Sequence, residues 1–200
     1  MTEASKKKGT MLLISGPSGS GKSSICKRLI EDPRVVFSVS ATTRTRREGE
    51  VDGRDYYFLT VDEFRAKREA GAFLESAEVY GNLYGTLRAP MKEAIEKGFI
   101  YLVEIDVQGA LQLRASEEPG IYVFIAPPSM DELESRLRGR GSESPESLAR
   151  RLGKAEDEYR ERHRYDYVIV NDGLEEAVRE VRRVAGLDEP STETAEGRKS

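Results

Sequence analysis

Short apolar runs interrupt an otherwise polar chain at regular intervals. They lie at residues 11–14, 35–39, 99–107, 121–126 and 167–170. Continuous apolar runs of this length are typical of strands that are buried on both faces of a parallel sheet. We therefore predict that these five runs form the core sheet of an α/β protein.

Apolar residues at helical spacing fill most of the intervals between these runs. A helix predicted over 22–30 ends before Pro33 and has one apolar face made of Ile25, Cys26, Leu29 and Ile30. Ser129 and Glu132 form a capping-box pattern ahead of a helix over 130–138, and Pro145 opens the next helix. A last helix carries Leu174, Ala177, Val178, Val181 and Ala185. Strands and helices in alternation predict a parallel sheet flanked by helices.

Two stretches do not fit this alternation. Residues 41–98 combine a polar segment with short aromatic runs around a helix, which Thr60 and Glu63 cap and Gly71 ends, and they predict a mixed α+β insertion lobe. Residues 136–151 are rich in Arg and Gly with little to bury, which predicts a mobile flap. The polar ends, 1–9 and 188–200, are interpreted as tails outside the fold.

Composition narrows the functional classes. The net charge of -4 argues against general attraction to nucleic acid polymers or to a membrane surface. A single cysteine, Cys26, and a single histidine, His163, exclude a disulfide framework and argue against a Cys/His metal site. We interpret Cys26 as a small buried residue and His163 as part of a solvated helix face. Without an apolar stretch of signal-peptide or membrane-span length, the chain is expected to be a soluble cytoplasmic domain, of undetermined oligomeric state.

The segment GPSGSGKS, residues 16–23, carries the most specific chemistry. It follows an apolar strand and precedes a helix, which is the context in which GxxxxGK[ST] binds nucleoside triphosphates. Its glycines let backbone N–H groups turn toward an anion, Lys22 is expected to reach the β and γ phosphates, and the Ser23 hydroxyl is expected to bind Mg²⁺. The candidate ATP-binding residues here are Gly16, Pro17, Ser18, Gly19, Ser20, Gly21, Lys22, Ser23 and Ser24. A glycine turn that only joins strand to helix is the weaker alternative.

An acidic residue lies where a metal would be needed. Asp106 comes at the carboxyl end of a predicted core strand, the edge at which open parallel sheets bind ligands. Its carboxylate could hold Mg²⁺ directly or through water, although an ordinary strand-end turn residue is equally compatible with its position alone. The phosphate loop favours the metal role.

The polar segment of the insertion lobe suits a second phosphate. Arg44 and Arg47 lie three residues apart and Tyr56 follows. Guanidinium groups with a phenol match a monoester phosphate, whereas most charge runs are only solvated surface. We therefore predict that this lobe binds the phosphoryl acceptor.

These segments together resemble the guanylate kinase family. The strings that carry the resemblance are residues 16–23, SVSATTRTRR at 38–47, GEVDGRDYYF at 49–58, AFLE at 72–75, YGNLYGT at 80–86, EIDVQG at 104–109, RLRGRG at 136–141 and YVIVND at 167–172. They span roughly residues 10–187. The resemblance implies a P-loop parallel-sheet core (10–40 and 99–187), a GMP-binding lobe at about 41–98 and an arginine-rich lid at about 130–155.

The resemblance also implies roles for individual residues. Arg44, Arg47, Tyr56 and Tyr84 would contact the GMP phosphate, Ser40, Glu75 and Thr86 would surround guanine, and Asp106 would lie beside GMP. Arg136, Arg140 and Arg151 would cover the triphosphate, with Asn171 near adenine; Lys22, Arg44, Arg140 and Arg151 would be catalytic. Guanine presents N1–H and a 2-amino group as adjacent donors, which one carboxylate such as Glu75 can accept together.

Two positions depart from the family pattern. Glu104 stands where the family often has Asp, so its carboxylate reaches one methylene further, and the sequence predicts no particular contact for it. Thr86 stands where some members have Ser and keeps the hydroxyl group.

The expected reaction is in-line transfer from ATP, with Mg²⁺, to GMP and also dGMP, without a covalent enzyme intermediate or a histidine base. Two alternatives remain open at this point. Guanylate-kinase-like scaffold domains recognise phosphorylated peptides, although their phosphate loop is typically degraded and this one is intact. A related kinase could act on a phosphorylated sugar, which would leave Ser40, Glu75 and Thr86 without a base to read.

Overall fold

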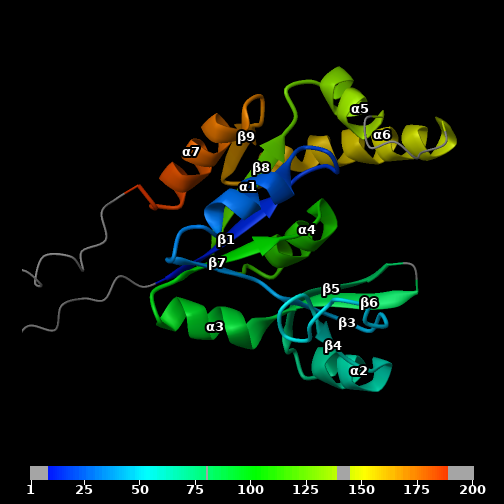
Figure 1. Ribbon diagram of the computed structural model, residues 1–200, viewed down its shortest axis with the longest axis vertical. Helices are drawn as coiled ribbons and strands as arrows, with labels where there is room; N and C mark the ends of the chain where they lie inside the picture. Colours follow the sequence, from blue (N-terminus) through cyan, green and yellow to red (C-terminus); the bar gives the residue numbers. More distant parts are fainter. Residues whose placement is uncertain (1–8, 80, 139–144, 189–200) are drawn as a thin grey trace, which may run out of the picture.

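The computed structural model describes residues 9–79, 81–138 and 145–188. Its core is a five-stranded sheet in the order β2-β7-β1-β8-β9, and every neighbouring pair is parallel (Figure 1). The strands are β1 (Thr10–Ser15), β2 (Val35–Phe37), β7 (Ile100–Glu104), β8 (Ile121–Ala126) and β9 (Tyr167–Val170). The predicted α/β fold with a parallel core sheet is confirmed.

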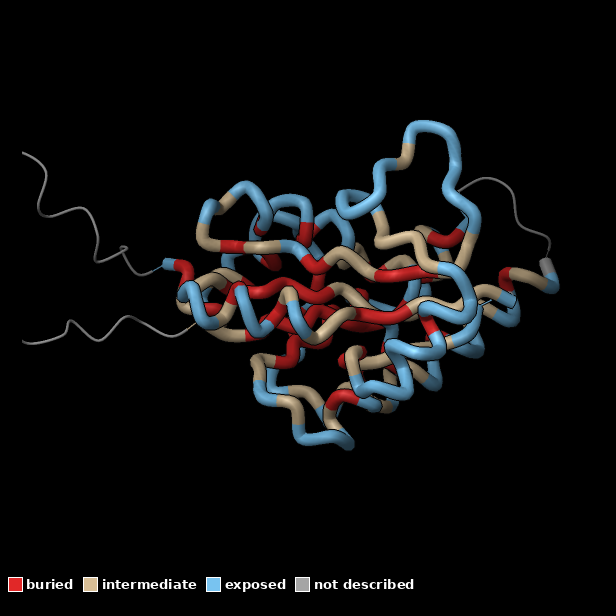
Figure 2. The backbone as a smooth tube through the Cα atoms, turned by 90° about the horizontal axis from the view of Figure 1, so that it is seen from below, coloured by how far each residue is buried: buried red, intermediate tan, exposed pale blue. Residues whose placement is uncertain are grey.

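Helices cover both faces of this sheet because successive side chains of a strand point to opposite sides. Leu12 and Ile14 of β1 belong to the apolar cluster that includes residues of α1 (Lys22–Leu29) and α7 (Leu174–Val184). Met11 and Leu13 belong to the cluster that includes residues of α3 (Arg88–Glu96) and α4 (Val107–Ala115). Buried residues therefore follow the strands through the middle of the molecule, with exposed helix faces outside (Figure 2).

Three details of the sequence prediction were wrong at the margins of this core. The run at 99–107 ends as a strand at Glu104, because Asp106 caps α4 and Val107 is already helical. β9 is an edge strand, so Val168 and Val170 are about half exposed rather than buried on both faces. Ile30 is also 46% exposed, since α1 ends at Leu29.

The insertion lobe is a second, four-stranded sheet in the order β4-β3-β6-β5 with α2 (Val61–Glu69) beside it. Its strands are β3 (Ser40–Thr42), β4 (Tyr57–Phe58), β5 (Phe73–Val79) and β6 (Asn82–Leu87). The predicted cap of α2 is present: Thr60 accepts from the Glu63 N–H and the Glu63 carboxylate accepts from the Thr60 N–H. The lobe has its own apolar cluster of Ala41, Phe64 and Phe73.

The boundaries of the lobe in the structure differ at both ends from the range 41–98 that the sequence predicts. Ser40 already belongs to the lobe sheet. α3, at the other end, packs on the core through Met91 and Ala94. The part of the chain that forms the lobe sheet and its helix therefore spans 40–87.

A β-bulge in β5 lies where the insertion lobe meets the core. The register with β6 shifts between Phe73 and Glu75, so Leu74 is the extra residue. At this bulge Phe73 is buried in the lobe cluster and the adjacent Leu74 is buried in the core cluster. The bulge also places Glu75 opposite Thr86 of β6.

The predicted flap consists largely of helices where it is described. α5 (Met130–Arg138) and α6 (Pro145–Arg160), followed by the short helix η1 (Glu161–Arg164), lie at one end of the core (Figure 1). Leu133, Leu137, Leu148 and Ala155 form a small apolar cluster of their own, so the expectation that 136–151 has little to bury was wrong. Its mobility stays a prediction. Ser129 does cap α5 through the Glu132 N–H, but the Glu132 carboxylate binds Arg136 and the reciprocal half of the capping box is replaced.

Residues predicted to be inert lie as expected: Cys26 is buried, and His163 is exposed on η1. No helix among the described residues is long and apolar enough to cross a membrane.

The lobe cluster predicts a local effect of mutation. The Phe64 ring is fully buried and stacks on Phe73 with centroids 4.4 Å apart. Phe64→Ala should cost about 3–5 kcal/mol, concentrated in the lobe. Hydrogen exchange should accelerate in β5 and β6 and stay unchanged in β1 and β8. Phe37→Ala, at a site 41% exposed, is the control. Equal acceleration in the core strands would contradict separate packing of the lobe.

Candidate active site

The loop between β1 and α1 wraps around a large cavity at the carboxyl edge of the core sheet. Gly16 and Gly21 adopt φ angles of 137° and 93°, which favour glycine. A Cβ at Gly16 would lie 2.3 Å from the Ile125 carbonyl oxygen, and one at Gly21 would lie 2.1 Å from the Asn171 amide nitrogen. Side chains at these positions would push the loop away from the sheet, so glycine is required to hold its backbone in place.

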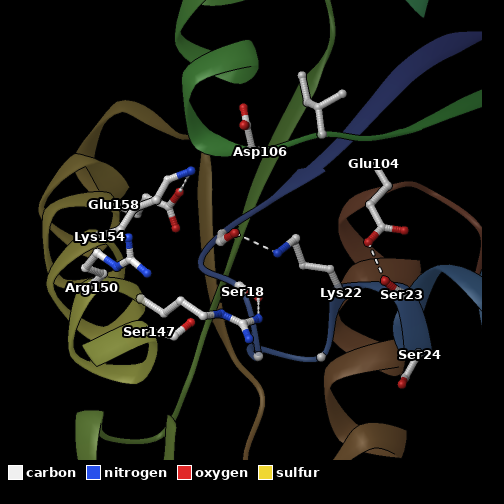
Figure 3. A pocket seen from close by; sticks show the side chains of 15 residues that line it. Ser18, Lys22, Ser23, Ser24, Glu104, Asp106, Ser147, Arg150, Lys154 and Glu158 are labelled. Atoms are coloured by element: carbon white, nitrogen blue, oxygen red, sulfur yellow. Dashed lines mark hydrogen bonds and ion pairs between the residues drawn. The ribbon is translucent and has the colours of Figure 1, made fainter. Parts of the chain in front are cut away.

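Lys22 crosses the inside of this loop. Its ammonium donates to the carbonyl oxygens of Gly16 at 2.7 Å and Pro17 at 2.9 Å (Figure 3). Burial lowers the pKa of Lys22, and the nearby carboxylates of Glu104 and Glu158 oppose that shift. A half-buried cation whose pKa is lowered by desolvation is stabilised by a bound anion, so the loop suits a phosphate group.

The cavity has a volume of about 930 Å³. Seven of the nine loop residues predicted to bind ATP line it, namely Gly16, Ser18, Gly19, Gly21, Lys22, Ser23 and Ser24. Pro17 and Ser20 are buried, and their carbonyl oxygens accept from Lys22 and Asn171. The loop therefore brings its side chains and its backbone to one surface.

Acidic residues face the loop from the sheet. The Ser23 hydroxyl donates to Glu104 at 2.6 Å, and Asp106 lines the same cavity while its carboxylate caps α4 by accepting from the Gly109 N–H at 2.9 Å. The contact of Glu104, uncertain from sequence, is thus with Ser23. The position of Glu104 at the carboxyl end of β7, beside the phosphate loop, is the feature from which this contact could have been predicted.

This set of residues fits a magnesium site that needs a nucleotide. Across residues 9–79, 81–138 and 145–188, no group of three or more His, Cys, Asp or Glu is arranged to hold a metal. Mg²⁺ is usually held by one or two carboxylates, waters and substrate phosphates rather than by a complete protein cage. Ser23, Glu104 and Asp106 supply the oxygen atoms that such a shared site requires.

Arginines of the helices α5 and α6 contact the loop and the turn after β9. Arg151 donates to the Ser18 hydroxyl at 2.8 Å, and Arg136 donates to the Asn171 carbonyl oxygen at 3.2 Å. Asn171 in turn donates from its side-chain amide to Ser20 at 2.8 Å, so its amide supports the loop. Arg140 lies outside the described residues.

Sequence reasoning missed four residues of α6 that line the cavity: Ser147, Arg150, Lys154 and Glu158. Ser147, Lys154 and Glu158 lie on the same face of α6 as Arg151. Successive members of this set, at positions 147, 151, 154 and 158, are three or four residues apart, which is the spacing of one helix face. The sequence prediction used only the apolar face of this helix. The regular spacing of polar residues on the other face could have predicted these four cavity residues.

The arginine-rich segment of the lobe is held together by contacts among charged and aromatic side chains. Arg44 donates to Glu50 at 2.7 Å, and its guanidinium carbon lies 5.4 Å from the centre of the Tyr56 ring. Tyr84 contacts Tyr56 edge to face, with ring centroids 6.2 Å apart. The Arg47 N–H also donates to Glu50, at 2.7 Å. The hydrogen bond from Arg44 lowers the pKa of Glu50, which therefore places its negative charge between groups predicted to bind phosphate.

Ser40, Thr86 and Glu75 lie in one row across three neighbouring strands. Ser40 pairs with Thr86 in the register of β3 and β6, and Glu75 pairs with Thr86 from β5. The Thr86 hydroxyl donates to Glu75 at 2.8 Å. Burial raises the pKa of Glu75 above its ordinary value, although this hydrogen bond lowers it.

The row adjoins the wall of the phosphate cavity. A Cβ built on Gly109 would lie 3.4 Å from one Glu75 oxygen and 3.5 Å from one Asp106 oxygen. The two carboxylates therefore approach each other beside α4, and Asp106 alone of the pair lines the cavity. The loop cavity and the lobe therefore adjoin each other at Asp106 and Glu75.

Comparison with known proteins agrees with this geometry. Residues 8–186 match the guanylate kinase family. A guanylate kinase of Nitratidesulfovibrio vulgaris is 53% identical over 178 residues, covering 88% of this chain and 86% of the relative. One of Clostridium acetobutylicum is 49% identical over 178 residues, covering 89% and 85%. The crystal structure of guanylate kinase from Anaplasma phagocytophilum has a TM-score of 0.69 at 36% identity, covering 94% of this chain and 89% of that one.

The chain belongs to the guanylate kinase family. It is accordingly an enzyme, a nucleoside monophosphate kinase, and the family resemblance found in the sequence is confirmed. In this guanylate kinase family member, α4 of the core contacts β5 of the insertion lobe. The roles of its individual residues stay predictions.

Glu75 gives a prediction that combines stability with recognition. Its raised pKa means that its favourable contribution to stability is present below the ordinary glutamate pKa of 4.5 and is lost as the pH rises through the higher pKa of the folded state. Glu75→Gln should therefore raise the Tm of the protein without ligand at pH 8, and the gain should shrink as the pH falls toward 4.5. The same change puts an amide donor against the donors of guanine, so kcat/KM for GMP should fall by about 100-fold or more, with little change in ATP binding.

Glu78→Gln, on an exposed position of the same strand, is the matched control. Thermal melts across this pH range and titration with each nucleotide make the measurement. Equal losses for ATP and GMP would show that Glu75 supports the fold as a whole and does not recognise the base.

Proposed function

We propose that this chain transfers the γ-phosphoryl group of ATP to GMP, giving ADP and GDP. ATP:GMP phosphotransfer is the reaction of the family to which it belongs. The observation that carries the assignment to this structure is the half-buried Glu75 carboxylate, which accepts a hydrogen bond from Thr86 and lies next to Asp106 at the wall of the phosphate cavity. Guanine can fill such a site because it offers two adjacent donors, which adenine lacks.

The donor half of the site is the loop. Lys22, now bonded to loop carbonyl oxygens, would transfer its ammonium donors to the β and γ phosphates of ATP. Ser23, Glu104 and Asp106 would hold Mg²⁺ together with those phosphates. When bound, Mg²⁺ would offset the negative charge that develops during phosphoryl transfer.

Arginines of the helices above the loop would complete the donor half. Arg151 already reaches Ser18, and Arg136 reaches the backbone at Asn171. We assign both to the triphosphate, with Arg140 as a further candidate outside the described residues, and Asn171 to the neighbourhood of adenine. Cations at this position neutralise charge on the transferring group.

The acceptor half is the lobe. Arg44, Arg47, Tyr56 and Tyr84 would bind the phosphate of GMP, which would replace the Glu50 carboxylate on the Arg44 guanidinium. Ser40, Glu75 and Thr86 would contact the base, and Asp106 would lie where the two nucleotides meet. None of these assigned contacts uses the sugar 2′-hydroxyl, so dGMP should also be accepted.

The chemistry then requires mainly position and charge. An oxygen of the GMP phosphate is already nucleophilic, so it attacks the γ phosphorus in line while ADP leaves, and no side chain needs to accept a proton first. We further propose that residues 10–187 act as one functional unit and that it works in the cytoplasm. The lone, buried Cys26 suits a reducing compartment.

A substrate panel tests this function. With ATP and Mg²⁺, ADP formation should depend on GMP or dGMP, while AMP, CMP, UMP and ribose 1,5-bisphosphate should give less than about 1% of that rate, because only guanine satisfies Glu75. Lys22→Ala should abolish turnover and keep the far-ultraviolet circular dichroism spectrum. Turnover with the bisphosphate but not with GMP would identify a sugar-phosphate kinase. Absence of turnover with every acceptor would favour a binding module.

A further inference from the structure

One face of α6 carries an ion pair into the cavity. Lys154 and Glu158 line the same space as Lys22 and Asp106, and both side chains project from α6 toward the loop (Figure 3). They lie one turn and two turns beyond Arg151, which itself contacts Ser18. The pair therefore occupies the part of the cavity between the donor loop and the wall formed by Asp106.

The geometry differs from that of an ordinary helix-surface pair. Lys154 Nζ lies 3.5 Å from Glu158 Oε1, and the two side chains are 58% and 11% exposed. The comparable pair Lys97 and Glu93 on α3 is closer, at 2.6 Å, with both side chains about two-thirds exposed. In α6 the acid is thus largely withdrawn from water and the lysine is held only loosely.

The negative charge of Glu158 is not fully stabilised by Lys154. Burial raises the pKa of Glu158, and the attraction of Lys154 lowers it only in part. The 3.5 Å contact with Lys154 therefore does not fully stabilise the ionised acid against its loss of hydration. Lys154 can leave it for a stronger anion that enters the cavity.

Two of the other cations that line the cavity are bonded at its edges, and Arg150 also lines it. Lys22 is bonded to the loop carbonyl oxygens, and Arg151 is bonded to Ser18. Lys154 reaches the cavity between them and Asp106, where two phosphate-bearing substrates would bring their negative charges together. Like charges in that space need a cation from outside the loop.

We propose that Lys154 is a phosphate-contacting residue of this enzyme, and that Glu158 is its counter-ion until the phosphates of the two nucleotides replace the carboxylate. The proposal rests on the proposed function. It assigns Lys154 to the phosphates where donor and acceptor meet, in addition to the arginines already assigned to the triphosphate.

Steady-state kinetics of the full-length enzyme test this assignment. Lys154→Met keeps the chain length and the helix but removes the charge, and it should lower kcat/KM for ATP and for GMP by about 10- to 100-fold, the effect of one charge-assisted hydrogen bond. Lys154→Arg should restore activity to within about threefold. Glu158→Gln should instead lower KM for the nucleotides, because Lys154 no longer has to leave a carboxylate.

Lys97→Met and Glu93→Gln, in the exposed pair on α3, are the matched controls. Equal losses from Lys154→Met and Glu158→Gln would overturn the proposal, because a pair that only supports the helix would lose either member with the same result. So would a loss confined to one substrate, or unchanged kinetics of Lys154→Met. Each of these results requires wild-type turnover with GMP, and its absence would count against the proposed function instead.

Discussion

The backbone path of residues 16–21 is the constraint on which the rest of the structure depends. A chain that turns its N–H groups inward around an anion must adopt left-handed conformations, and here Gly16 and Gly21 lie too close to β8 and Asn171 to carry side chains. The sheet, the turn after β9 and α6 hold this loop from separate directions through Ile125, Asn171 and Arg151. Its shape is therefore a property of the whole core and not of the loop alone.

The site contains charged groups that their partners within the protein stabilise only in part. Burial shifts the pKa values of Lys22, Glu75 and Glu158 away from the charged form. Each of these groups has a partial partner within the protein: carbonyl oxygens, a hydroxyl and a lysine. Glu50 plays the corresponding part for Arg44 in the lobe. Substrate binding then exchanges internal partners for stronger ones, which links the stability of the fold to occupation of the site.

Much of the core could be predicted from sequence because its signals are local. Apolar runs located all five core strands, and the glycine spacing located the loop. α3 and α4 escaped notice: α3 begins without a side-chain cap and contains Pro90, and its place is decided by packing of Met91 against the sheet. The bulge at Leu74 could not be predicted from the sequence either. It occurs where adjacent residues pack into two different apolar clusters, one in the lobe and one in the core.

The site shows the same division. Residues of the lobe that lie in one row, Ser40, Thr86 and Glu75, were grouped by family resemblance, because their alignment requires the pairing of strands distant in sequence. Glu50 and Glu158 were missed because an acid within a charged run has no distinctive pattern until its partner is known. Local chemistry was thus readable from the sequence, and long-range electrostatic pairing was not.

The central claim is that the loop cavity and the lobe are two halves of one clamp. It is tested most directly by calorimetric titration with a bisubstrate ligand in which adenosine and guanosine are joined through five phosphates. Simultaneous occupation predicts one ligand per chain, an affinity at least about 100-fold above that of ATP or GMP alone, and competition with both nucleotides. An affinity no better than that of ATP, with GMP still able to bind, would contradict the claim.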